Sequence, residues 1–134
     1  MSNDNTLINL EIEGLPPTVN HMHMKARGRV FRTKACKDFQ DFVTLKLKSL
    51  WGNKEPFTGR VALEITFTTN NKRRWDLDNR LKALQDCLTM AGIIKDDSQI
   101  DKILLLRNYG SENKTVLRLL KFEDGRLSNY CRKI

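Results

Sequence analysis

Three aspartates, Asp76, Asp78 and Asp97, lie in or beside one of the most basic segments of the chain. Hydrolysis of a phosphodiester near neutral pH needs a hard divalent cation that neutralises the non-bridging oxygens and activates water. Proteins hold Mg²⁺ with a few carboxylates, together with water and phosphate. Carboxylates surrounded by lysine and arginine therefore suit metal-dependent cleavage of a polyanion, because the cations offset the repulsion between the acidic residues and the substrate.

The spacing of these residues is compatible with one site. If Asp76 precedes a helix and Asp78 lies in its first turn, both side chains can converge at the helix N-terminus, where the macrodipole favours negative charge. Lys82 follows Asp78 by four residues and is expected beside it on the same helix face. A helix over residues 77–91 carries the chain roughly 21 Å away, so Asp97 can only just return to Asp76. Asp97 then lies back along the helix, or completes the site through a shorter helix or a second subunit.

The same residues also fit a purely structural interpretation. An aspartate before a helix is often an N-cap, and the helix dipole favours Asp78 in the first turn without any metal. Asp96, Asp97 and Ser98 read as a turn. Spacing alone favours this structural interpretation over a metal site, because short motifs often match by accident.

Hydrophobic periodicity predicts the elements that must position these residues. Alternation with a period of two predicts a strand at 7–13 and another from residue 61. The helical stripes of residues 35–50, with Phe39 and Phe42 in the core, and of residues 77–91 predict two helices. Residues 18–32 read as a basic loop that ends in a short extended piece at 29–32, and the strand-like segments 103–109 and 115–122 are expected to pair as a hairpin.

This order of elements predicts one domain over residues 1–134 with an α/β fold of the α+β type. We expect a mixed β-sheet with two main helices, too irregular for a run of βαβ units. The tail from about residue 123 lacks apolar periodicity and is expected to be loosely ordered.

Charge and composition narrow the class of partner. Lysine and arginine number 24 against 16 aspartates and glutamates, which gives a net charge of +8 and favours nucleic acid. No apolar run approaches the ~18 residues of a membrane span, and no P-loop motif indicates a nucleotide cofactor. The three separated cysteines and the polar N-terminus without a signal sequence favour a reducing cytoplasm. We expect DNA phosphate contacts from Lys25, Arg27, Arg29, Lys72, Arg73 and Arg74.

The segment RRWDLDNRLKALQDCLTMAGIIKDDSQI resembles the signature of the RusA-like Holliday junction resolvases. The shared features are a basic run, Asp-Leu-Asp-Asn, a lysine four residues after the second aspartate, a helix that closes in Ala-Gly, and Asp-Asp before a strand. The earlier LPPTVN is similar to the Pro-Pro and Asn element of the same family. The resemblance spans most of the chain, although the first helix and the tail match only in type.

The resemblance implies that Asp76, Asp78 and Asp97 bind the metal and that Lys82 is the essential lysine. It implies a homodimeric endodeoxyribonuclease, encoded by a bacterium or a bacteriophage, that uses Mg²⁺, or alternatively Mn²⁺, to resolve four-way junctions by paired nicks. Trp75 stands where family members often have arginine, and its indole is expected in the core or stacked on an unpaired base. Two alternatives stay open: a nuclease of broader branched-DNA specificity, and a non-catalytic DNA-binding accessory protein whose aspartates are only caps.

Overall fold

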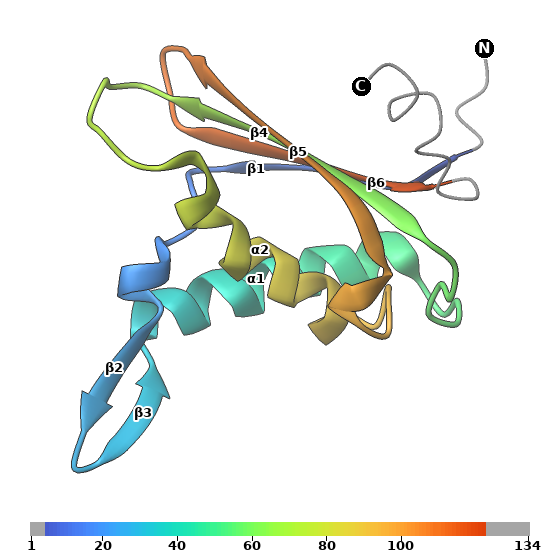
Figure 1. Cartoon of the computed structure of the whole chain (residues 1–134), viewed down its shortest axis with the longest axis horizontal. Coiled ribbons are helices and arrows are strands. Elements are labelled where there is room, and N and C mark those ends of the chain that lie inside the picture. Colours follow the sequence, from blue (N-terminus) through green and yellow to red (C-terminus); the bar gives the residue numbers. More distant parts are fainter. Residues whose placement is uncertain (1–4, 123–134) are drawn as a thin grey trace, which may run out of the picture.

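The computed structural model describes residues 5–122, and its centre is one four-stranded sheet covered on one face by two helices (Figure 1). The helices are α1 (Lys34–Trp51) and α2 (Leu81–Met90). The strand order is β1-β6-β4-β5, with β4 and β5 parallel and the other neighbours antiparallel. The strands are β1 (Thr6–Glu13), β4 (Val61–Thr69), β5 (Ile100–Tyr109) and β6 (Lys114–Lys121). The predicted α+β fold with a mixed sheet and two helices is confirmed.

The core lies between the helices and the sheet, where alternating strand residues point inward. Val61, Leu63, Ile65 and Phe67 of β4 are fully buried, as their alternation predicts. They share one cluster with residues of α1 and α2 that include Val43, Leu47, Leu84 and Leu88. Of the helices in the described part of the chain, none is long and apolar enough to cross a membrane. The tail predicted from about residue 123 falls outside the described residues.

The predicted hairpin between 103–109 and 115–122 is wrong. β6 pairs with β1 and β4, and the chain steps over β4 between β5 and β6. Leu117 and Leu119 of β6 are fully buried, whereas Leu104 and Leu106 of β5 are exposed. The more apolar strand therefore takes the central place, and β5 becomes the edge. One βαβ unit, formed by β4, α2 and β5, is present as well.

The basic segment before α1 is an antiparallel hairpin with a short 3-10 turn, η1 (Val19–His21), in front of it, where the sequence predicted mostly loop. The hairpin consists of β2 (His23–Ala26) and β3 (Arg29–Arg32), and only the extended piece at 29–32 was predicted. Its two loop residues, Arg27 and Gly28, both have positive φ, at 53° and 75°. Positive φ at both positions defines a type I′ turn, which the Arg-Gly pair permits and helical periodicity cannot detect. The hairpin projects from the body of the molecule (Figure 1).

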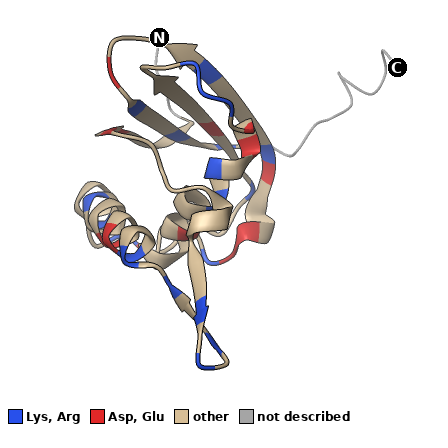
Figure 2. Ribbon diagram, turned by 90° about the vertical axis from the view of Figure 1, so that its left-hand side faces the viewer, with Lys and Arg blue, Asp and Glu red and all other residues tan. Residues whose placement is uncertain are grey.

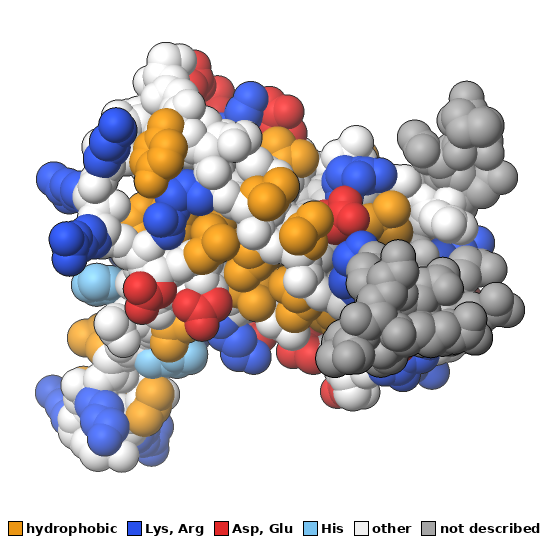
Figure 3. Space-filling view, turned by 45° about the horizontal axis from the view of Figure 1, so that its top comes forward, with side chains coloured by type: hydrophobic (Ala, Val, Ile, Leu, Met, Phe, Trp, Pro, Cys, Tyr) orange, Lys and Arg blue, Asp and Glu red, His pale blue; other side chains and the backbone are white. Residues whose placement is uncertain are grey.

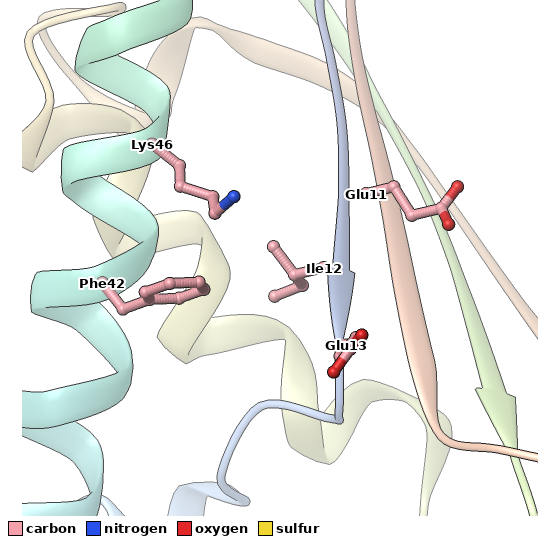
Figure 4. A pocket seen from close by; sticks show the side chains of 5 residues that line it. All are labelled: Glu11, Ile12, Glu13, Phe42 and Lys46. Atoms are coloured by element: carbon pink, nitrogen blue, oxygen red, sulfur yellow. The ribbon is translucent and has the colours of Figure 1, made fainter.

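Helix α1 has the predicted extent but a rotated buried face. The Thr33 hydroxyl caps it by accepting from the Cys36 N–H, and its buried residues are Cys36, Gln40, Val43, Leu47 and Trp51. Phe42 is 50% exposed, so the prediction that it lies in the core is wrong. The polar Gln40 occupies the core position instead, because its side chain has buried partners. Figure 4 shows Phe42 and Lys46 of α1 facing Ile12 of β1 around a cavity of about 590 Å³, which none of the candidate site residues lines.

The buried Gln40 side chain joins three elements around the second helix. Its Oε1 accepts from Arg32 at the base of the hairpin, and its Nε2 donates to the Ala83 carbonyl in α2. Replacing it leaves a buried carbonyl without a donor, which carries a desolvation penalty.

We predict that Gln40→Leu lowers the free energy of unfolding by about 1 to 3 kcal/mol, because the Ala83 carbonyl loses its partner. Urea denaturation followed by circular dichroism measures this change. The exposed neighbour Asp41, replaced by asparagine, is the control and should change stability little. Equal stabilities of Gln40→Leu and the wild type would contradict the role assigned to these hydrogen bonds.

Candidate functional site

Asp76 and Asp78 lie at the start of a short 3-10 helix, η2 (Leu77–Arg80), that leads directly into α2. Asp76 occupies the N-cap position with extended backbone angles, yet its side chain makes no capping hydrogen bond. Both carboxylates are exposed, and neither takes part in an ion pair within residues 5–122. The interpretation of Asp76 as a structural cap is therefore wrong, and both side chains remain available as hard oxygen ligands of the kind that Mg²⁺ prefers.

The two adjacent aspartates after α2 differ in what they contact. Asp96 caps the 3-10 helix η3 (Asp97–Gln99) by accepting from the Ser98 N–H at 2.8 Å. Hydrogen bonds from Ser98, through its side chain and then its backbone, lower the pKa of Asp96. Asp97 instead accepts from the Thr89 hydroxyl at 3.1 Å, and its other oxygen lies 3.9 Å from the Lys82 ammonium. Asp96 therefore has a structural role as a cap. Asp97 does not cap η3 and is the better candidate for the functional site.

Gln99 anchors the loop that carries Asp97. Its buried amide Nε2 donates to the carbonyls of Phe57 and Gly59, and its Oε1 accepts from the N–H groups of Lys95 and Asp96. The loop is thus tied to the segment that precedes β4. Gly92, with a φ of 74°, ends the helical run as the sequence predicted, so the chain turns back early enough for Asp97 to lie along α2.

Lys82 projects from the first turn of α2 and reaches along the helix. Its Nζ lies 2.8 Å from Asp86 as well as 3.9 Å from Asp97. The hydrogen bond to Asp86, and secondarily the charges of Asp86 and Asp97, raise the pKa of Lys82, so the side chain stays an ammonium at neutral pH. The predicted pairing of Lys82 with Asp78 is wrong, because Asp78 lies in η2, where the α-helical i, i+4 geometry does not apply.

The structure therefore brings Lys82 and Asp97 together and leaves Asp76 and Asp78 at the start of η2. In the described part of the chain, no three His, Cys, Asp or Glu side chains are grouped so that they could hold a metal ion together. Asp76 lines a cleft of about 470 Å³ together with four basic side chains, and Asp97 lines one of about 300 Å³ together with Asp86 and Thr89. The basic residues of the first cleft are His21, Arg73, Arg74 and Arg80.

Sequence reasoning missed two residues of this cluster. Asp86 and Thr89 share the polar side of α2 with Lys82, and neither was among the candidate site residues predicted from the sequence. Asp86 instead pairs with Lys82, and Thr89 holds Asp97. The spacing of four residues between Lys82 and Asp86 was a signal that could have identified the first contact. Thr89 gave no such signal, because its partner comes from the loop beyond the helix.

Basic side chains lie on both sides of this region. Lys25, Arg27 and Arg29 are exposed on the β2–β3 hairpin, and Figure 2 shows blue Lys and Arg positions along the hairpin at the bottom of the molecule. Residues 72–74 are exposed on the segment between β4 and η2. Figure 3 shows carboxylates beside a cluster of Lys and Arg side chains at the left of the molecule. The acidic residues therefore lie in a positive field, which favours a polyanionic ligand.

Trp75, directly before Asp76, is half-buried and packs edge-on against Phe67, with ring centroids 5.7 Å apart. Two guanidinium groups lie over its ring, that of Arg107 at 4.3 Å and that of Arg80 at 4.8 Å. We call Trp75, Arg80 and Arg107 the Trp75 clamp. Of the two expected locations for this indole, the structure gives packing against the core, and Trp75 also lines the cleft beside Asp76.

The sequence matches a known class of DNA-cleaving enzymes. The family model described as Endodeoxyribonuclease RusA matches residues 13–119. The crossover junction endodeoxyribonuclease RusA of Aquifex aeolicus (strain VF5) is 28% identical over 102 residues, which cover 72% of this chain and 76% of the relative. The enzyme of Enterobacteria phage HK97 is 32% identical over 102 residues, with coverages of 69% and 76%. That of Shigella sonnei (strain Ss046) is 34% identical over 88 residues, with coverages of 63% and 70%. The chain belongs to the RusA endodeoxyribonuclease family, which confirms the resemblance.

The different contacts of Asp96 and Asp97 give a sharp prediction. Asp97→Asn should reduce DNA cleavage by about 100-fold or more, because it removes a negatively charged oxygen of the kind that binds a divalent cation, while DNA binding is retained. Asp96→Asn should stay within a few-fold of wild type, because asparagine also caps helices well. Single-turnover cleavage at saturating protein measures both rates. The opposite order of severity would assign the site to Asp96.

Proposed function

We infer that this chain is an endodeoxyribonuclease that resolves four-way DNA junctions, and we propose that Asp76, Asp78 and Asp97 hold the Mg²⁺ on which hydrolysis depends. One observation carries the metal proposal. Asp76 and Asp78 stand exposed in a basic surface, and Asp76 does not perform the capping role that its position offers. Carboxylates that stabilise nothing locally, in a chain of this family, are best explained as ligands. Mn²⁺ offers the same hard-ligand chemistry and is the alternative metal.

The roles of the side chains follow from their contacts. Mg²⁺, when bound, neutralises a non-bridging phosphate oxygen and makes water a better nucleophile. Asp76 and Asp78 enter from η2 and Asp97 from η3, so the carboxylates approach from both ends of α2. Thr89 orients Asp97 by donating to one of its oxygens. Which of the carboxylate oxygens face the phosphate depends on the bound DNA.

Lys82 is proposed as the residue that stabilises the leaving oxygen. Its ammonium is compact, charged at neutral pH, and adjacent to Asp97. A preorganised cation placed where negative charge develops lowers the barrier without reorganisation. Asp86 holds the exposed Lys82 side chain along α2, with its ammonium 2.8 Å from Asp86 and 3.9 Å from Asp97.

The basic segments on either side are proposed as the surfaces that hold the DNA backbone. Lys25, Arg27 and Arg29 project from a hairpin whose residues are all exposed, which suits insertion against a groove or into a junction. Residues 72–74 lead directly to Asp76 and can position the backbone at the site. Each phosphate contact adds to the salt dependence of binding. We propose a cytoplasmic location, because the DNA of a bacterium or a replicating phage is found there.

We predict that Asp76→Asn and Asp78→Asn each abolish cleavage of a four-way junction in Mg²⁺ while binding stays equal or becomes tighter, because each removes a ligand and a negative charge. A denaturing gel with strand-specific labels measures cleavage, and a mobility shift without metal measures binding. Glu64→Gln, on the outer face of the sheet, is the matched control and should cleave like the wild type.

The same gel separates the alternatives. Paired nicks in the junction, with Y-forks and linear duplexes cut far more slowly, support junction resolution. Equal rates on all branched substrates would support a nuclease of broader specificity. An intact junction after incubation of the wild type with Mg²⁺ or Mn²⁺ would support a non-catalytic binding protein and overturn the proposal.

A second copy of the chain is proposed as the partner that makes the second nick. Resolution of a junction requires cuts in two strands, and a two-fold dimer presents two sites in matching orientation. β5 is an edge strand of the sheet, and it exposes Ile103, Leu104, Leu106 and Tyr109. Figure 3 shows a band of hydrophobic side chains across the middle of the molecule. A long apolar edge strand is normally covered, and pairing with the same edge of a second copy covers it.

We predict that the double substitution Leu104→Lys and Leu106→Lys converts a dimer to a monomer and reduces coordinated double nicking, because it places charge on the strand edge. Sedimentation velocity measures the mass, and the strand-labelled gel counts the nicks. Leu45→Lys, on the exposed side of α1, is the control and should stay dimeric. A wild type that sediments as a monomer both alone and on a junction would contradict the paired mechanism.

A further inference from the structure

The Trp75 clamp connects the segment that carries Asp76 and Asp78 to the sheet. Arg107 extends from β5, donates a hydrogen bond to the Trp75 carbonyl, and places its guanidinium over the Trp75 ring. The carbonyl that accepts this bond belongs to the peptide that leads into Asp76. The orientation of that peptide is therefore set from β5, outside the site.

The other end of the same segment closes on the same ring. Arg80 is the last residue of η2, and its guanidinium lies over Trp75 while it donates to the Pro16 carbonyl. Within the segment, the Asn79 N–H donates to the Asp76 carbonyl. Residues 75–80 thus form a loop whose two ends meet at one indole, with Asp76 and Asp78 between them.

This arrangement is not explained by stability alone. The Nε atoms of Arg80 and Arg107 are both buried without a hydrogen-bond partner among the described residues. Burial of a polar group without a hydrogen-bond partner is unfavourable. The cation–π interaction with an aromatic ring offsets only part of this desolvation cost. A geometric role for the two guanidinium groups accounts for an arrangement that stability alone does not favour.

We propose that Arg107 is a positioning residue for the nuclease reaction: through the carbonyl and ring of Trp75 it fixes the angle at which Asp76 and Asp78 enter η2. The proposal rests on the proposed function, in which these aspartates hold the metal. In this chain, Trp75 then acts by packing against the guanidinium groups of Arg80 and Arg107, and it does not contact phosphate itself. Misplacement of catalytic groups by about 1 Å can reduce a rate about 100-fold.

The test compares Arg107→Ala, Arg107→Lys, Trp75→Ala and the Arg107→Ala/Trp75→Ala double variant. Arg118 on β6, which β4 separates from β5, is the matched control, since it is also half-buried but pairs with Glu64 at 2.8 Å. Calorimetric titration with Mg²⁺ in the absence of DNA measures metal affinity. Single-turnover cleavage at saturating protein and a thermal melt complete the measurements.

Arg107→Ala should weaken Mg²⁺ binding and slow cleavage by about tenfold or more, with junction affinity in the absence of metal changed by less than about threefold. Arg107→Lys should be intermediate, because it keeps a charge and a donor but loses the planar fork. The double variant should lose less than the product of the two single effects, since both act through one contact. Arg118→Ala should leave the Mg²⁺ affinity and the cleavage rate unchanged.

Several results would overturn the positioning role. The positioning role is wrong if Arg107→Ala keeps the Mg²⁺ affinity and the cleavage rate of the wild type. It is also wrong if the effects of Arg107→Ala and Trp75→Ala are independent of each other. Weaker junction binding at an unchanged saturated rate would make Arg107 a plain phosphate contact. If Arg107→Ala does not fold, wild-type behaviour of the folded Arg107→Lys and Trp75→Ala variants has the same meaning. Normal cleavage by Asp76→Asn would instead contradict the proposed function itself, so the two failures are distinguishable.

Discussion

The parallel pairing of β4 with β5 is the constraint on which the site depends. Two parallel neighbours cannot be joined by a tight turn, so the chain must cross one face of the sheet between them, and α2 makes that crossing. Asp76 and Asp78 precede the crossing, and Asp97 follows it. Leu84 and Leu88 fix the helix against the core, which directs its polar side outward. Lys82 then reaches along that side to Asp97, and the two ends of the crossing are linked.

Much of the fold could be predicted because period-two and period-3.6 patterns report which residues face a core. β1, β4 and the extents of α1 and the second helical run followed from such patterns. Strand neighbours could not be predicted, because β5 and β6 are each apolar and only packing decides which one is central. The hairpin of residues 23–32 was missed because its positive-φ turn at Arg27 and Gly28 is a backbone property. Phe42 was misplaced because Gln40, a polar residue with buried partners, took the core position.

The candidate site was likewise predicted in part from the sequence, and the rest of it depends on tertiary contacts. The types and spacing of the aspartates were compatible with phosphodiester chemistry, and resemblance to a family supplied the preference for that chemistry and for Asp97 over Asp96. The structure supplies a physical basis for that selection, since Asp96 caps η3 and Asp97 faces Lys82. The Asp86 and Thr89 contacts depend on how the loop after α2 returns, which no local pattern encodes. The Trp75 clamp joins residues 32 positions apart, from Trp75 to Arg107, and was equally invisible to spacing.

The central claim is that carboxylates from both ends of α2 in one chain hold the same metal. The most direct measurement is anomalous diffraction from a crystal of the protein bound to a four-way junction in the presence of Mn²⁺. The account predicts an anomalous peak in contact with the carboxylates of Asp76, Asp78 and Asp97 of a single chain, which requires η2 and η3 to draw together when the metal binds. A peak that contacts none of these aspartates, or one that joins Asp76 to Asp97 of the partner subunit, would contradict it.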